Sequence, residues 1–408
     1  MQLRIVVSQF WRDLKAHRLR TGLTLFGLGW GTFCVVVLLS FGEGLNRQQL
    51  TRTAAMGDRI ILLWGSRTGK AFAGLPQGRR IRLEESDTDA ILAQVSDVTR
   101  ASPEYDSSSP MKGPAGETTP GISGVRPSFG VMRKVEPVPG GRFIDELDQQ
   151  ERRRVAVLGY QVAQDLFGGK NAVGQMVEIS GVPFLVIGAL PHKNQDSNYN
   201  GPDDRRVIIP AATAHASLGI ESPDNFVIEY RDGVKGKAVM QEINAVLGRI
   251  HHYDPTDEEA LMSWDVGEMI ALFSTVFLGF KIFLALLGAL TLAVAGIGVA
   301  NIMSMVVEDR TSHIGISMAL GARRRWVLGQ ILLETLLVTT VGGGLGVLLA
   351  TLVVAAGQHL PMGEMGTPVF SWQIALLTAG LLGIIGVISG LGPARRASRL
   401  NPAEALRS

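Results

Sequence analysis

Residues 308–325 read EDRTSHIGISMALGARRR, a polar and basic segment between two long stretches that carry almost no charge. Four stretches of the chain lack Asp, Glu, Lys and Arg altogether, namely 21–42, 282–307, 335–363 and 365–394. A helix of about 20 residues crosses roughly 30 Å of hydrocarbon. The sequence therefore predicts four transmembrane helices. The alternative, a set of buried helices in a large soluble core, is disfavoured because such helices rarely run this long without charge.

Basic residues near the ends of these stretches predict their orientation, because Lys and Arg in short flanks stay on the cytoplasmic side. The flank before residue 21, the segment 308–325 and the C-terminal tail are basic, whereas the loop 357–370 has no Lys or Arg. All three basic flanks can be cytoplasmic together if both termini are inside and residues 43–268 are outside. The residues counted are Arg4, Arg12, Lys15, Arg18, Arg20, Arg310, Arg323, Arg324, Arg325, Arg395, Arg396, Arg399 and Arg407.

Helix-breaking residues and charges predict where each segment of the chain begins and ends. The N-terminal residues place apolar side chains on one face and basic ones opposite, which is typical of an interfacial helix, although a simple extension of the first span remains an alternative. The predicted order is a cytoplasmic amphipathic helix in 1–20, a first span in 21–42, an extracytoplasmic domain in 43–268, a second span with an outer stalk in 269–307, a cytoplasmic segment in 308–325, a third span in 326–356, a short external loop in 357–369, a fourth span in 370–392 and a cytoplasmic tail in 393–408.

The stretch between the first and second spans is long enough for its own core. Residues 58–64 and 155–158 are typical of strands, 83–95 and 161–167 of helices, and 177–179 and 184–187 of further strands. Residues 101–142 are rich in Pro, Gly and Ser, so short strands and a boundary between two lobes are expected there. An α+β domain is predicted. Its stability must come from packing, because the only cysteine, Cys34, lies in the first span.

Two motifs in this domain resemble binding sites but lack the required spacing. GSRTGK at 65–70 has a Gly-Lys pair without the spacer and the Ser or Thr of a phosphate loop. His251 and His252 with the acidic residues that follow fit no zinc pattern. We therefore expect this chain to bind no metal, ATP or other cofactor, to carry no catalytic residues, and to have no nucleic-acid partner.

Three further stretches carry a family resemblance. AVAGIGVANIMSMVVEDRTSHIGISMALGARRRWVLGQILLETLLVTTVGGGLG at 293–346 resembles the permease core of the MacB and FtsX-like superfamily of ABC transporters. VAVLGYQVAQDLFGGKNAVGQMVEISGVPFLVIGAL at 155–190 resembles the periplasmic core of that family, and PARRASRLNPAEALRS at 393–408 its C-terminal signature. The sequence departs from the family pattern at His313, where an acidic residue is common, and at Ser317, where a basic one is common.

The resemblance implies that the segment 308–325 docks on a separate ATPase subunit. A helix capped by Thr311 or Ser312 and closed by Gly321 would suit this role, with Ile314 paired with Met318 and Ile316 with Leu320. Two turns of helix are too short to be stable alone, so they need a surface to lie on. The alternative is a juxtamembrane turn whose basic residues contact anionic lipid headgroups. The predicted coupling residues are Glu308, Arg310, Thr311, Ser312, His313, Ile314, Gly315, Ile316, Met318, Leu320, Gly321 and Arg323.

The spans contain no ionisable side chain near their centres, which argues against a secondary transporter or an ion channel. Glu334 is predicted near the inner interface beside Gln330, because it follows the last arginine of the segment by nine residues. Four glycines at small-xxx-small spacing are expected to pack helices together, either between subunits or inside one subunit. They are Gly342, Gly346, Gly386 and Gly390.

The expectation is thus a MacB-type permease in a bacterial inner membrane. The resemblance implies a homodimer with two copies of a separate ATPase, which binds ATP and Mg and whose motion is passed across the membrane to the external domain. That domain would drive export of a periplasmic or outer-leaflet substrate, with a periplasmic adaptor and an outer-membrane channel in a Gram-negative cell. Alternatives are a permease of the same superfamily that extracts lipoproteins or lipids, and a non-transporting FtsX-like regulator of cell-wall hydrolases.

Overall fold

The computed structural model describes residues 18–54, 57, 59–192, 199–358 and 367–400. It divides into two compact units, a membrane unit of residues 1–48 and 274–408 and an extramembrane domain of residues 49–273. Most of the predicted amphipathic helix in 1–20, most of the loop 357–369 and the tail from 401 onward lie outside the described residues.

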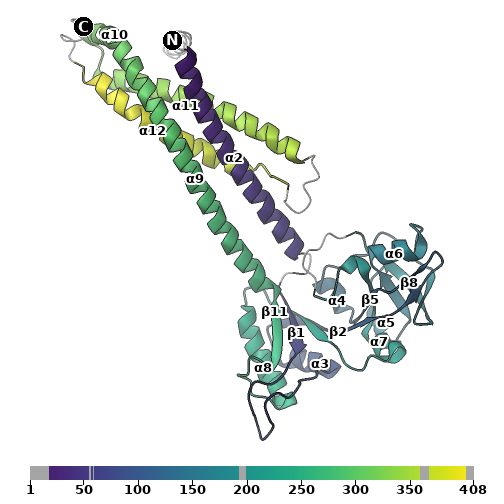
Figure 1. Cartoon of the computed structure of the whole chain (residues 1–408). Coiled ribbons are helices and arrows are strands. Elements are labelled where there is room, and N and C mark those ends of the chain that lie inside the picture. The colour runs from purple at the N-terminus through teal and green to yellow at the C-terminus, as the bar shows by residue number, and fades with distance from the viewer. Residues whose placement is uncertain (1–17, 55–56, 58, 193–198, 359–366, 401–408) are drawn as a thin grey trace. The chain divides into compact units, whose positions relative to one another are not determined.

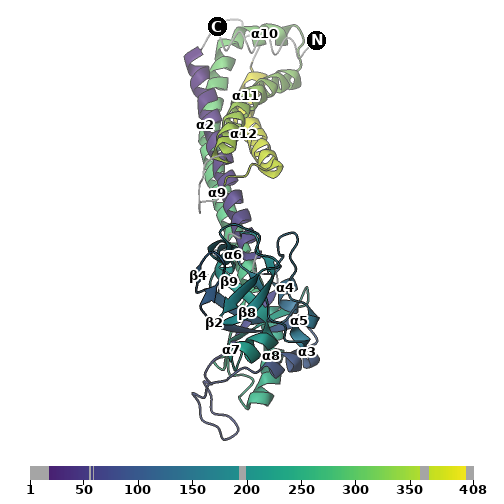
Figure 2. The same cartoon turned by 90° about the vertical axis from the view of Figure 1, so that its right-hand side faces the viewer.

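The membrane unit contains four helices that are long and apolar enough to cross a membrane. They are α2 (Arg18–Ala54), α9 (Val266–Asp309), α11 (Arg324–Gln358) and α12 (Trp372–Ser398), and the short helix α10 (Thr311–Ala319) lies between α9 and α11. This confirms the predicted fold class, with the extramembrane domain between the first and second of these helices. In both views α11 and α12 lie side by side (Figure 1 and Figure 2).

Helices α2 and α9 continue beyond the charge-free windows that predicted them. Beyond these windows the two helices carry charged side chains, and ion pairs contribute to the contacts there. Glu43 accepts from Lys281 of α9 at 2.6 Å and from Arg47 of its own helix at 2.9 Å. These charges lie just outside residues 21–42 and 282–307, as the hydropathy pattern requires.

Residues 49–273 form a single mixed sheet with short helices on it. Among the described residues the strand order is β11-β1-β10-β2-β5-β9-β6-β8-β7-β3-β4, antiparallel except for the pairs β5–β9 and β6–β8. The strands are β1 (Ile60–Gly65), β2 (Val98–Ser108), β3 (Met111–Lys112), β4 (Glu117–Thr118), β5 (Gly121–Val125), β6 (Val155–Leu158), β7 (Met176–Ile179), β8 (Val182–Ala189), β9 (Arg206–Pro210), β10 (Asn225–Tyr230) and β11 (Leu261–Asp265). The helices are α3 (Glu85–Gln94), α4 (Ser128–Met132), α5 (Glu146–Gln150), α6 (Tyr160–Phe167), α7 (Ala211–Leu218) and α8 (Gly236–His251), with the 3-10 turn η1 (Asp203–Arg205).

The strands and helices predicted over residues 155–190 are confirmed with small changes at their ends. Helix α3 starts at Glu85, two residues after the predicted start, because Glu84 and Asp87 form a capping box in which the backbone N–H of Glu84 donates to Asp87 Oδ2 at 2.8 Å. The short strands expected in 101–142 are present as β3, β4 and β5. The segment also begins inside an eleven-residue strand, β2, which pairs with β10 on one side and β5 on the other. Its Pro, Gly and Ser content therefore did not reveal a central strand.

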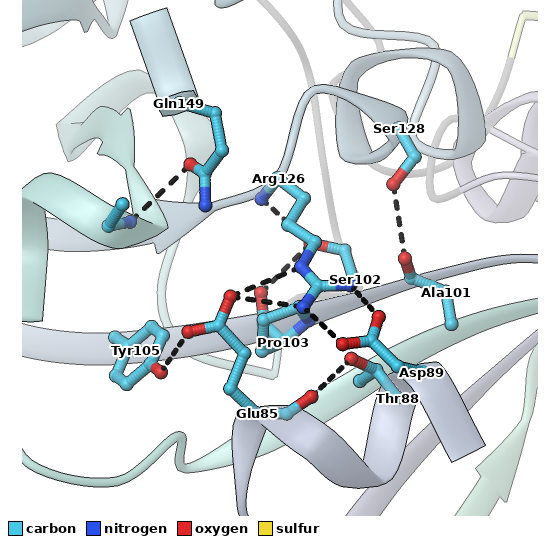
Figure 3. A network of polar contacts seen from close by, with 11 residues as sticks. Glu85, Thr88, Asp89, Ala101, Ser102, Pro103, Tyr105, Arg126, Ser128 and Gln149 are labelled. Atoms are coloured by element: carbon cyan, nitrogen blue, oxygen red, sulfur yellow. Dashed lines mark hydrogen bonds and ion pairs between the residues drawn. The ribbon is translucent and has the colours of Figure 1, made fainter. Parts of the chain in front are cut away.

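Arg126, directly after β5, ties that part of the sheet to α3 (Figure 3). Its guanidinium donates to Glu85 at 3.1 Å and to Asp89 at 2.6 Å, and its backbone N–H donates to Ser102 Oγ at 3.0 Å. Burial acts to lower the pKa of Arg126, but the two carboxylates outweigh it and the pKa is raised overall. Arg126 therefore links the end of β5 to α3 by ion pairs, although Arg126 and Glu85 lie 41 residues apart in the sequence.

Candidate coupling site

Helix α10 follows α9 after one residue and starts without the predicted side-chain cap. Its N-cap residue is Arg310, and the hydroxyl of Thr311 donates backward to the carbonyl oxygen of Val307 at 3.1 Å. The prediction that Thr311 or Ser312 caps the helix was wrong. The last turn of α9 precedes Thr311, so the carbonyl oxygen of Val307, four residues earlier, accepts from this hydroxyl.

The predicted end of α10 at Gly321 is confirmed. Gly321 has φ +100°, a conformation that favours glycine because it lacks a Cβ atom. Its N–H donates to Met318 O at 3.1 Å, and the N–H of Ala322 donates to Ser317 O at 3.0 Å. This pattern is a Schellman motif, which satisfies the last carbonyls of a helix and stops it.

The apolar residues of α10 and its C-cap residue, Leu320, divide between two faces. Ile314 and Met318 are partly buried and pack against the core of the membrane unit. Ile316 is 44% exposed and Leu320 is 84% exposed. One apolar pair therefore fixes α10 to its own chain, and the other is left on the outer surface. Of the remaining predicted coupling residues, Gly315 is buried, Arg310 and Thr311 are half-buried, and Glu308, Ser312, His313, Gly321 and Arg323 are exposed.

A buried ion pair joins the start of α10 to α11. Arg310 Nη1 lies 3.1 Å from Glu334 Oε1 and 3.3 Å from Oε2, and the Glu334 side chain is only 5% exposed. Gln330 Nε2 donates to the same carboxylate at 3.4 Å, which confirms that Gln330 lies beside Glu334, while the location near the inner interface stays a prediction. Arg310, predicted as a contact to the ATPase, thus donates within its own chain. The only signal in the sequence was a carboxylate in an apolar helix, which favours a cationic partner but does not single out Arg310, 24 positions away.

Arg310→Ala is expected to lower the thermal unfolding temperature of the purified protein in detergent. The substitution leaves the buried Glu334 carboxylate without its charge partner, which costs about 3–5 kcal/mol. The exchange of Arg310→Glu with Glu334→Arg should recover much of this loss. The control is Lys112→Ala, because Lys112 pairs with Glu117 on the exposed surface and such pairs contribute little. A loss no greater than that of the control would show that the pair is not structural.

The four glycines predicted to pack helices all face other helices of the same chain. A Cβ atom at Gly346 would overlap the carbonyl oxygen of Gly29 in α2, and one at Gly342 would lie 3.0 Å from the Cβ atom of Leu28. Gly386 and Gly390 of α12 face Thr339 and Thr335 of α11 in the same way. Their small size lets the backbones approach closely inside one subunit.

The two motifs that resembled binding sites take part in internal contacts. The N–H groups of Gly69 and Lys70 donate to Asp257 Oδ2 at 2.8 and 3.1 Å, so a carboxylate of this chain occupies the Gly-Lys turn. His251 Nε2 lies 2.8 Å from Asp87 Oδ2. In the described part of the chain, no three His, Cys, Asp or Glu side chains are grouped as a metal site would need.

Four apolar helices with an α+β domain inserted between the first two define the class of multi-pass membrane permeases with a large extramembrane domain. The model of the MacB-like periplasmic core domain matches residues 21–246, and that of the FtsX-like permease C-terminal region matches residues 285–402. The chain belongs to this family, the MacB and FtsX-like permeases of ABC transporters.

Curated relatives match nearly the whole chain. This chain is 31% identical over 407 residues to the macrolide export ATP-binding/permease protein MacB of Bdellovibrio bacteriovorus. It is 34% identical over 404 residues to the pyoverdine export ATP-binding/permease protein PvdT of Pseudomonas syringae pv. syringae. Each match covers 98% of this chain but only 61% and 58% of the relative. The periplasmic region of MacB from Actinobacillus actinomycetemcomitans matches 56% of this chain and 98% of its own length, at 16% identity and a TM-score of 0.43.

Proposed function

We propose that this chain is the permease subunit of an ABC exporter and that it transmits the motion of an ATPase to its extracytoplasmic domain. It acts as a homodimer with a separate ATPase subunit that binds ATP and Mg. The observation that carries this proposal is the division of α10 into an inner and an outer apolar pair. Ile316 and Leu320 form the contact surface for the ATPase, while Ile314 and Met318 connect α10 to the membrane helices.

Two connections pass the motion onward from α10. The Arg310–Glu334 pair connects it to α11 through a buried contact. Helix α9 connects it to the extramembrane domain, because α9 is a continuous helix of 44 residues, about 66 Å long at 1.5 Å per residue. At its start, Asp265 Oδ1 accepts from the N–H groups of Gly267 and Glu268, which caps the helix directly after β11.

The interior of the membrane unit supports a mechanical role over a polar pathway. Three of its buried hydroxyls donate to carbonyl oxygens of their own helices: Thr32 to Leu28 at 2.7 Å, Thr335 to Ile331 at 2.8 Å and Thr378 to Ile374 at 2.7 Å, whereas the buried Ser40 hydroxyl has no such acceptor among the described residues. Side chains satisfied in this way offer little to a polar solute. The substrate is therefore handled by the extracytoplasmic domain and does not pass between the helices.

The named relatives favour export over the alternatives of lipoprotein extraction and regulation of cell-wall hydrolases. Both relatives carry export and ATP binding in their names. The chain spans about three fifths of their length, so their substrates are not transferred to it. In a Gram-negative cell, a periplasmic adaptor and an outer-membrane channel would complete the export route.

Orientation is tested by labelling single cysteines with an impermeant thiol reagent in intact cells, after Cys34 is replaced by Ala. Exposed positions are required, because a buried cysteine would not react on either side of the membrane. A cysteine at Glu221 should be labelled, and one at Ala319 in α10 should be labelled only after the cells are opened. Labelling of Ala319→Cys in intact cells would place α10 outside and would reject the proposed function.

A further inference from the structure

Strand β11 is an edge of the sheet. It pairs with β1 on one side, and no described strand pairs with it on the other. In an antiparallel pair every second residue directs its N–H and C=O groups away from its neighbour. An edge of this kind is a template for a further strand, which proteins usually block with charges, prolines or bulges. The sequence of β11, LMSWD, has one charged residue, at its end.

A groove runs between this edge and α8, and Figure 1 shows these two elements side by side. It holds about 850 Å³. The buried residues Val239, Ile243 and Leu247 turn the apolar face of α8 to the sheet. The half-buried Met240 and the polar Gln241 and Asn244 are left to line the groove, opposite residues 261–265. Its floor therefore offers apolar contact beside open backbone groups.

The groove carries an excess of negative charge. Glu258, Asp265 and Glu268 line it, whereas Lys237 is the only basic side chain that the described residues contribute to the lining. Asp265 is already engaged as the cap of α9 and as the acceptor of the Tyr230 hydroxyl at 3.1 Å. Glu258 and Glu268 are exposed and lie beyond the two ends of the strand. Met262, between them, is 58% exposed.

We propose that β11 and α8 form a docking groove for an extended, basic segment of a partner protein, which adds to β11 as a further strand. Backbone hydrogen bonds along the edge supply the affinity, and alternate side chains supply the specificity. One apolar side chain of the partner contacts Met240, on the face of the sheet that α8 covers, and basic side chains pair with Glu258 and Glu268. The proposal concerns the extramembrane domain alone and does not depend on export or on the ATPase.

The test uses the full chain in detergent and three fluorescent peptides of eight residues. The first alternates Lys and Val, the second alternates Glu and Val, and the third is the Lys–Val peptide with one central Pro, which removes a backbone donor. The Lys–Val peptide is expected to bind with a saturable anisotropy change, and the other two at least tenfold more weakly. Binding should slow hydrogen exchange of the amides in residues 261–265, which nonspecific charge attraction would not do.

A double variant, Glu258→Lys with Glu268→Lys, should weaken binding of the Lys–Val peptide at least tenfold. The matched control, Glu151→Lys with Glu221→Lys, changes two exposed carboxylates elsewhere in the domain and should leave binding unchanged. Equal loss in both variants, binding without protection of 261–265, or no saturable binding below about 1 mM would each overturn the proposal. Protection that rises with protein concentration and needs no peptide would assign the edge to a second copy of the chain, which also overturns it.

Discussion

An Ile316→Glu variant is expected to insert into the membrane and fold normally but to copurify with less than a tenth of the ATPase bound by the unchanged chain. Ile316 is 44% exposed on the outer face of α10, so the substitution costs little in the free permease. Burying an unpaired carboxylate against an apolar groove of a partner costs several kcal/mol, and 1.4 kcal/mol is already a tenfold change in affinity. The measurement is the molar ratio of ATPase to permease after copurification from cells that express both.

Two control variants separate loss of docking from loss of folding. Val131→Glu places the same carboxylate at a 61% exposed apolar position in the extramembrane domain and should leave the ATPase ratio unchanged. Ile316→Val keeps an apolar side chain and should retain most of the binding. Full ATPase recovery with Ile316→Glu would show that α10 does not dock through this face, and the basic residues that follow it would then be assigned to contacts with lipid headgroups.

The four membrane helices could be predicted from the sequence because hydrocarbon excludes charge, and a charge-free window of that length rarely occurs in a soluble protein. The end of α10 was predictable for an equally local reason. Gly321 adopts a conformation that other residues rarely reach, and it follows a short run of helical spacing. Both signals come from residues that lie close together in the chain, so no knowledge of tertiary contacts was needed.

Features that depend on distant residues could not be predicted in the same way. The Arg310–Glu334 pair joins residues 24 positions apart, and only the turn through α10 brings them together. Strand β2 contains Pro103 and two serines at its end, a composition typical of loops, yet it pairs on both sides. Tertiary context outweighed local propensity there. The predicted cap at the start of α10 was wrong for a related reason, because the hydroxyl of Thr311 donates to Val307 of α9.

Replacement of the extramembrane domain is the second change with a large expected effect. A flexible polar linker in place of residues 49–263 keeps Asp265 as the cap of α9. It removes only the last residues of α2 and leaves its apolar part, Gly22–Gln48, and helices α9 to α12 unchanged. ATPase recruitment should persist, because Ile316 and Leu320 belong to the other unit of the chain. ATP hydrolysis by the partner ATPase should continue uncoupled from transport, and export should be lost entirely.

The most direct test of force transmission is to measure hydrolysis and export separately for this linker variant. Hydrolysis is measured on the purified complex. Export is measured as release into the medium of a compound whose efflux requires the intact chain, identified beforehand by comparing cells with and without it. Protease protection establishes that the variant is inserted. The account predicts hydrolysis and ATPase binding without export. Export by an inserted linker variant would contradict it, because the substrate path would then have to run between the membrane helices.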